Sequence, residues 1–163
     1  MPSFDIVSKI NQQEVKNAVD QVKREITTRY DFKGTDSEID LKNQSEIYIE
    51  SATHERLNAL FQVLQEKFIK RNISLKFLDP KNIEEGSKGR AKQTINLKSG
   101  VDKENSKLII SKIKELDIKQ ITPSYQSDLI RVTAKKRDDL QNVISSLKSA
   151  ELPIHLEFEN FRD

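Results

Sequence analysis

The sequence contains no cysteine and no tryptophan, and only four glycines and four prolines among its 163 residues. Without cysteine the chain forms no disulfide, offers no thiolate ligand to a metal and has no thiol nucleophile. No apolar run approaches the roughly 18 residues of a membrane-spanning helix. The stretch MPSFDIVSKINQQEV lacks the basic-then-apolar pattern of a secretory signal. These absences predict a cytoplasmic protein with no membrane partner.

Charged residues make up 33% of the chain and hydrophobic residues 35%, which favours small domains with much surface over one deep core. The net charge is only +2. Residues 1–85 hold 13 Lys+Arg and 15 Asp+Glu, whereas residues 86–163 hold 15 and 11. The second half is therefore mildly basic, which permits contact with phosphate groups without requiring it.

Hydrophobic periodicity predicts one order of elements twice: strand, helix, strand, strand, helix, strand. The apolar positions of residues 47–64 recur 83 residues later, as Ile47 and Ile130 illustrate, which indicates an internal duplication. Each copy fits the α+β ferredoxin-like βαββαβ domain, a four-stranded antiparallel sheet with two helices on one face. The strands expected are SFDIVS, EIDLKN, EIYIES and SLKFLDP in the first copy, and QTINLKSG, ITPSYQ, DLIRVTA and IHLEFENF in the second.

Residues 81–91, KNIEEGSKGRA, show no periodicity and contain two of the four glycines. This composition predicts a linker loop.

Nothing in the sequence predicts catalysis. It has no P-loop, no GxGxxG and no HxxxH, and neither His54 nor His155 has a Ser, Cys or carboxylate at a recognised spacing. We therefore expect no enzymatic activity, no cofactor and no bound metal.

Ferredoxin-like sheets bind single-stranded RNA by stacking bases on aromatic rings of the two central strands. Alternation places only Tyr48 there in the first copy, and Arg131 in the second. An arginine guanidinium stacks on bases as well, so Arg131 is a candidate. Each residue by itself is better explained as a cross-strand neighbour of charged side chains on a solvated face.

The stretch RYDFKG lies between a predicted helix and a predicted strand. In an extended segment Tyr30 and Phe32 would point the same way, and Arg29 and Lys33 the other way. The pattern fits an aromatic pair packed at the core edge under a row of charges. The alternative is a site where Arg29 and Lys33 bind phosphate beside a ring that stacks on a base.

A second cationic cluster, Lys135, Lys136 and Arg137, precedes the last predicted helix, whose first turn holds Asp138 and Asp139. The two acids suit the positive end of the helix dipole, whereas three cations do not unless they face an anion. Helix N-termini also bind phosphate through free N–H groups. The alternatives are a phosphate-binding turn and a solvated turn with mutually paired charges.

Five stretches together, in this order, carry a family resemblance: MPSFDIVS, RYDFKG, INLKSG, RVTAKKRDDLQ and FENFRD. Through them the chain resembles, over essentially its whole length, the YajQ family of bacterial proteins. The resemblance implies two tandem ferredoxin-like domains that exchange their first strands. Residues 9–98, including the strand at 92–98, would form the first domain, and residues 1–8 plus 99–163 the second.

The resemblance also implies binding of nucleotides or RNA, with some members acting as cyclic di-GMP effectors through protein or DNA partners, and no enzymatic activity. We therefore expect non-catalytic binding of RNA or a cyclic dinucleotide such as cyclic di-GMP. The charge and aromatic patterns assign the contacts to Arg29, Tyr30, Phe32, Lys33, Arg131, Lys135, Lys136 and Arg137. The alternative is an adaptor or regulator whose ligand is another protein, bound by the open sheet faces and residues 81–91.

Overall fold

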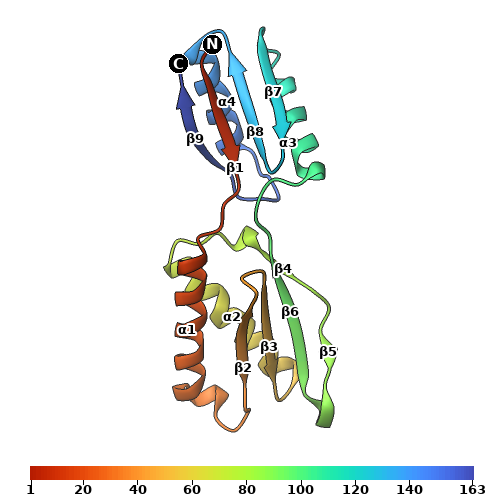
Figure 1. The fold of residues 1–163 in the computed structure, drawn as a ribbon. Helices are drawn as coiled ribbons and strands as arrows, with labels where there is room; N and C mark the ends of the chain where they lie inside the picture. Colours follow the sequence, from red (N-terminus) through yellow and green to blue (C-terminus); the bar gives the residue numbers. More distant parts are fainter. The chain divides into compact units, whose positions relative to one another are not determined.

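The computed structural model describes residues 1–163, which form two compact units, each with its own hydrophobic core. One unit consists of residues 10–98 and the other of residues 1–9 and 99–163. In each, two helices pack on one face of an antiparallel sheet (Figure 1). The α+β class and the two ferredoxin-like domains predicted from the repeat are therefore confirmed.

The unit of residues 10–98 is built around a sheet with strand order β2-β3-β6-β4, and a short strand, β5, also pairs with β6. Its core combines side chains of the two helices with those on one face of the sheet. The elements in chain order are α1 (Gln12–Thr28), the 3-10 turn η1 (Tyr30–Phe32), β2 (Glu38–Lys42), β3 (Glu46–Ser51), α2 (His54–Lys70), η2 (Leu75–Phe77), β4 (Leu78–Pro80), β5 (Glu84–Glu85), η3 (Ser87–Gly89) and β6 (Ala91–Leu97).

The unit of residues 1–9 and 99–163 has the strand order β7-β8-β1-β9. Its central strand β1 pairs with β8 and β9, while β6 pairs with β3 and β4 in the other unit. The elements are β1 (Ser3–Val7), α3 (Lys103–Glu115), β7 (Ile121–Gln126), β8 (Leu129–Ala134), α4 (Arg137–Ser149) and β9 (Glu157–Arg162).

Local chemistry explains where the helices begin. The side chains of Asn11, Thr53 and Asp102 each accept a hydrogen bond from a backbone N–H three residues later, which caps α1, α2 and α3. The N-cap of α4 is Lys136, whose side chain makes no capping bond because an ammonium is only a donor. No helix is both long and apolar enough to cross a bilayer.

Two of the expected strands are shorter than their alternation suggests. In SLKFLDP the Ser74 hydroxyl accepts the N–H of Lys76 at 3.2 Å, so the chain makes the turn η2 and β4 starts only at Leu78. Leu75, which alternation would place in the core, is 36% exposed, whereas Phe77 is buried. In IHLEFENF the strand β9 begins at Glu157.

Residues 81–91, for which the sequence predicts a linker loop, lie within the unit of residues 10–98. They contain η3 and the short strand β5, which pairs with the start of β6. The amide of Gln93 also donates to the carbonyl oxygen of Lys81 at 2.8 Å. The chain passes between the two units at residues 9–10 and 98–99.

The charge balance of the two units differs from that of the two halves of the sequence. Residues 10–98 hold 16 Lys+Arg and 14 Asp+Glu, whereas residues 1–9 and 99–163 hold 12 of each. The excess of cations in the second half of the sequence comes from Lys88, Arg90, Lys92 and Lys98, which fold with the first unit. Neither unit is therefore strongly basic, and any anion site must be a local cluster.

Candidate functional site

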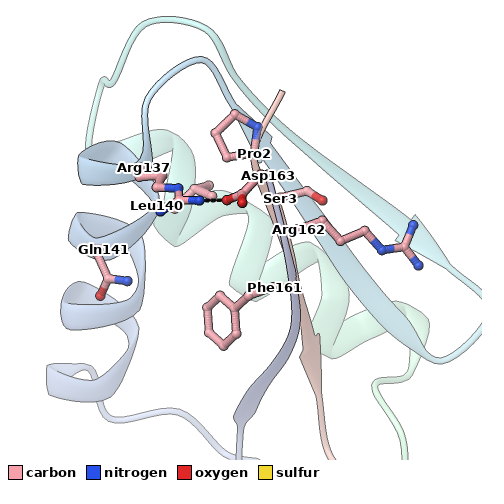
Figure 2. A pocket seen from close by; sticks show the side chains of 8 residues that line it. All are labelled: Pro2, Ser3, Arg137, Leu140, Gln141, Phe161, Arg162 and Asp163. Carbon is pink, nitrogen blue, oxygen red and sulfur yellow. Dashed lines mark ion pairs between the residues drawn. The ribbon is translucent and has the colours of Figure 1, made fainter.

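One hollow combines arginine side chains with an aromatic ring. It lies in the unit of residues 1–9 and 99–163, between the start of α4 and the end of β9, and its volume is about 270 Å³ (Figure 2). Its walls are formed by Pro2, Ser3, Arg137, Leu140, Gln141, Phe161, Arg162 and Asp163.

Arg137 is placed at this hollow by the end of β8. The strand ends at Ala134, which is buried, and the next two residues, Lys135 and Lys136, are exposed. Arg137 is the first residue of α4. Its guanidinium forms an ion pair with the carboxylate of Asp163, and both side chains are exposed (Figure 2). The cation that begins α4 is therefore already paired with an anion at the mouth of the hollow.

Phe161 reaches the hollow because β9 contains a bulge. Opposite β1, Ser3 faces Arg162 and Asp5 faces Glu159, so β9 has one residue more than β1 over this stretch. Asn160 has a φ of 57°, a left-handed conformation that asparagine tolerates better than most residues. The bulge shifts the alternation of side chains along the strand by one residue.

As a result, both Phe158 and Phe161 lie on the helix-facing side of the sheet. Both rings contact the fully buried Phe4, Phe158 edge-on at 5.9 Å between centroids and Phe161 stacked at 5.8 Å. Phe161 is nevertheless 59% exposed. The ring of Phe161 thus offers much of its surface to the hollow.

A second hollow of about 400 Å³ contains the other predicted cations of this region. It is lined by Ile118, Lys119, Gln120, Lys135, Lys136 and Asp139. Three ammonium groups therefore surround one cavity beside the first turn of α4, with a single carboxylate among them. Such a cluster suits a phosphate group.

Arg131, the predicted base-stacking residue of β8, is instead engaged by a buried carboxylate. Its Nε donates to Asp5 Oδ1 at 2.9 Å and its Nη2 to Oδ2 at 3.3 Å, while Asn160 Nδ2 donates to Oδ2 at 2.8 Å. Asp5 is only 4% exposed, and the hydrogen bonds from Arg131 lower the pKa of its carboxyl. The arrangement explains Arg131 as the partner of Asp5.

The cluster at residues 29–33 lies in the other unit. Arg29 caps the end of α1, and its guanidinium donates from Nε and Nη2 to the two carboxylate oxygens of Asp31, at 3.0 and 2.8 Å. The segment forms a 3-10 turn, so the expectation that Tyr30 and Phe32 point the same way is wrong. Tyr30 is 91% exposed and Phe32 is 3% exposed in the core, while Lys33 is exposed. Phe32 therefore offers no surface for stacking.

Tyr48, the remaining aromatic candidate, also interacts with neighbouring side chains through both its hydroxyl and its ring. Its hydroxyl donates to Glu50 Oε1 at 2.7 Å, and the Lys42 ammonium lies 4.6 Å from the ring centroid. Burial and the bond to Glu50 raise the pKa of Tyr48 to about 12. Arg90 closes this network by donating to Glu50 Oε2 at 2.9 Å and to the carbonyl oxygens of Thr35 and Asp36.

The structure thus gathers Lys135, Lys136 and Arg137 around the start of α4 and adds Phe161 and Lys119, two residues that the sequence patterns missed. Simple alternation along FENFRD places Phe161 on the face opposite Phe158, because a bulge is invisible to a period of two. Lys119 lies between α3 and β7 and carries no pattern of its own. No group of three or more His, Cys, Asp or Glu side chains is placed to hold a metal ion.

Comparison with known proteins shows a family likeness over the whole chain. The model of a family described as nucleotide-binding protein YajQ-like matches residues 2–162. A protein of Carboxydothermus hydrogenoformans is 48% identical over 98% of this chain and 97% of its own length, and one of Trichlorobacter lovleyi is 47% identical over the full length of both. A protein of Anaeromyxobacter sp. (strain K) is 44% identical over the full length of both. All three are named nucleotide-binding protein, a name that describes binding and no reaction.

Proposed function

Because the chain belongs to the YajQ-like family of nucleotide-binding proteins, we propose that it binds a nucleotide, without catalysis, at the hollow between α4 and β9. The observation that carries this proposal is that the half-exposed ring of Phe161 and the guanidinium of Arg137 line the same cavity (Figure 2). A nucleotide presents a flat base and a phosphate. Base–aromatic stacking contributes about 1–3 kcal/mol, and arginine recognises phosphate in a bidentate geometry.

The ion pair between Arg137 and Asp163 supports a phosphate position at the Arg137 guanidinium, because this group already holds an anion. An incoming phosphate would replace the carboxylate on the guanidinium. Such an exposed pair is worth only about 0–1 kcal/mol, so displacing it costs little. The start of α4 adds backbone N–H groups that no side chain caps and that favour an anion.

We further propose that the ligand is RNA or a cyclic dinucleotide such as cyclic di-GMP, and the second hollow supports this choice. The first cavity, at about 270 Å³, is smaller than a typical site for a drug-sized ligand, which is about 300–1,000 Å³. It suits one base and one phosphate. Lys119, Lys135 and Lys136 on the neighbouring cavity would bind a further phosphate of the same ligand, which a mononucleoside monophosphate lacks.

Affinities for cyclic di-GMP, GMP and a short single-stranded RNA, measured at one salt concentration, test the proposal. We expect Phe161→Ala to weaken binding about tenfold, because the base loses its stacking surface. Arg137→Ala should weaken binding by a similar factor and reduce its salt dependence, because one phosphate contact disappears. The matched control is Lys107→Ala, which removes an exposed cation of α3 that lines neither cavity.

Wild-type affinity of Phe161→Ala for every ligand would contradict the site. Loss of binding in Tyr30→Ala and Lys33→Ala, with Phe161→Ala unaffected, would move the site to the cluster at residues 29–33. The absence of any nucleotide or RNA binding at physiological salt would favour the alternative function, an adaptor that binds a protein.

A further inference from the structure

β9 is an edge strand with a groove beside it. It pairs with β1 alone, as the end of the order β7-β8-β1-β9 (Figure 1). Edge strands present unpaired N–H and C=O groups on which a further strand can add. Between β9 and α4 lies a groove of about 600 Å³, whose wall combines the apolar side chains of Ile144, Leu156, Phe158 and Phe161 with the polar side chains of Gln141, Lys148 and Glu157. The Lys148 ammonium lies 5.9 Å from the centroid of the Phe158 ring. A strand added to β9 would cover this groove.

The opposite edge of the sheet is less suited to such pairing. β7 contains Pro123, which has no N–H to donate and which is typical of protected edges. β9, with the sequence EFENFR, contains no proline. The free backbone edge of this unit that can accept a strand is therefore that of β9.

The sequence of β9 is complementary to itself in an antiparallel pair. With a twofold axis between Glu159 and Asn160, Glu157 faces Arg162 of a second copy and Phe158 faces Phe161 of the second copy. Opposite charges and aromatic pairs are the favourable cross-strand neighbours. A shift of one residue in either direction places a phenylalanine opposite a charged residue and loses both matches.

The bulge makes this register sterically consistent. Directly opposed residues of two paired strands lie on one face of the sheet, yet in a regular strand Glu157 and Arg162, five residues apart, lie on opposite faces. The extra residue at Asn160 places both on the side away from the helices, in register with Val7 and Ser3 of β1.

Phe158 and Phe161 likewise share one face of the sheet, the one that faces the helices. Both contact Phe4 on the helix-facing side, so each can meet its counterpart across the axis over the groove. Both matches of the register thus join residues that share a face.

We propose that two copies of this protein associate through β9 about a twofold axis, which joins their four-stranded sheets into one of eight strands. The two Phe158–Phe161 pairs cover the two grooves on the helix-facing side. The two Glu157–Arg162 ion pairs form on the opposite face of the sheet. Each copy uses β9 once, so the contact is isologous and stops at the dimer. This inference does not rest on the proposed nucleotide binding.

Sedimentation velocity over a wide range of protein concentration tests the proposal with two charge reversals. The wild type should pass from 18.8 kDa to twice that mass as concentration rises. Glu157→Arg alone, or Arg162→Glu alone, places like charges opposite each other at both ends of the pairing, and each should weaken self-association about tenfold or more. An equimolar mixture of the two variants restores opposite charges at both ends and should form a heterodimer.

The control Glu151→Arg makes the same change of charge at an exposed position outside β9 and should dimerise like the wild type. Circular dichroism and thermal unfolding confirm that every variant is folded. Three results would each overturn the proposal: a wild type that stays at 18.8 kDa throughout, a dimer that Glu157→Arg leaves intact, or a mixture that stays monomeric.

Discussion

Asp5 shows how a charged residue occupies the middle of a central strand. Its carboxylate is 4% exposed and accepts hydrogen bonds from Arg131 on one neighbouring strand and from Asn160 on the other. Arg162 continues the chain of contacts by donating from Nε to Asn160 Oδ1 at 3.3 Å. The carboxylate thus links β8, β1 and β9, and removing its charge leaves Arg131 without a partner.

We expect Asp5→Asn to lower the free energy of unfolding at neutral pH by about 2 kcal/mol, the range of hydrogen bonds to charged groups. The folded-state pKa of Asp5 is lowered, so its contribution is fully present above the unfolded pKa of about 3.9. It is lost as the pH falls through the folded-state value. Urea unfolding at pH 7 and at pH values below 4 should therefore show the difference between wild type and variant shrinking in acid.

Asp40→Asn is the matched control for Asp5→Asn. Asp40 is exposed on β2, 3.5 Å from the Lys23 ammonium, and its replacement should change stability by at most about 0.5 kcal/mol. A difference for Asp5→Asn that is absent at pH 7, or that is constant with pH, would contradict the structural role of the carboxylate.

At the scale of the element, the bulge in β9 decides which side chains reach the helix face. One added residue at Asn160 places Phe161 beside Arg137 at the hollow and Glu157 on the same face as Arg162. Both the proposed nucleotide site and the proposed dimer contact depend on this local break in the strand. Substitutions of Asn160 should therefore show how much the bulge contributes to the stability of the protein.

We expect Asn160→Ala to be less stable than Asn160→Gly by about 1 kcal/mol, because a left-handed φ of 57° strains alanine but not glycine. Both variants lose the amide bond to Asp5, so the difference between them isolates the backbone. Chemical denaturation of the two proteins gives this difference. Equal stability, or a more stable alanine variant, would show that β9 does not need the bulge.

At the scale of the whole molecule, the two units do not coincide with the two sequence repeats. The sheet of residues 10–98 has β6 as a central strand, although β6 opens the second repeat. The sheet of the other unit has β1 as a central strand, although β1 opens the first repeat. A fragment cut at the repeat boundary would therefore lack a central strand.

We expect a fragment of residues 10–98 to fold alone and a fragment of residues 1–85 to remain unfolded. The first contains every strand of its sheet and both helices of its core, whereas the second lacks β6, between β3 and β4. Cooperative thermal unfolding followed by circular dichroism distinguishes the two cases. Cooperative unfolding of residues 1–85, or its absence for residues 10–98, would show that the units are not autonomous.

The sequence by itself determined the elements, their order and most of the core. Helical spacing identified the buried face of α4, and alternation placed Ile47 and Ile130 inward. These properties are local: a period of 3.6 or 2 and a capping residue are read within a few residues. The same local reading located the cations at Lys135, Lys136 and Arg137.

Only the tertiary structure decided what those residues meet. Either sheet would satisfy the alternation of β1 and β6, so their partners follow from long-range pairing. Arg131 donates a hydrogen bond to Asp5, which lies 126 residues away in the chain. Phe161 joins Arg137 because a bulge reverses its face. A sequence period describes which side of an element is apolar, whereas contacts between distant segments depend on register, and register is set by the assembled fold.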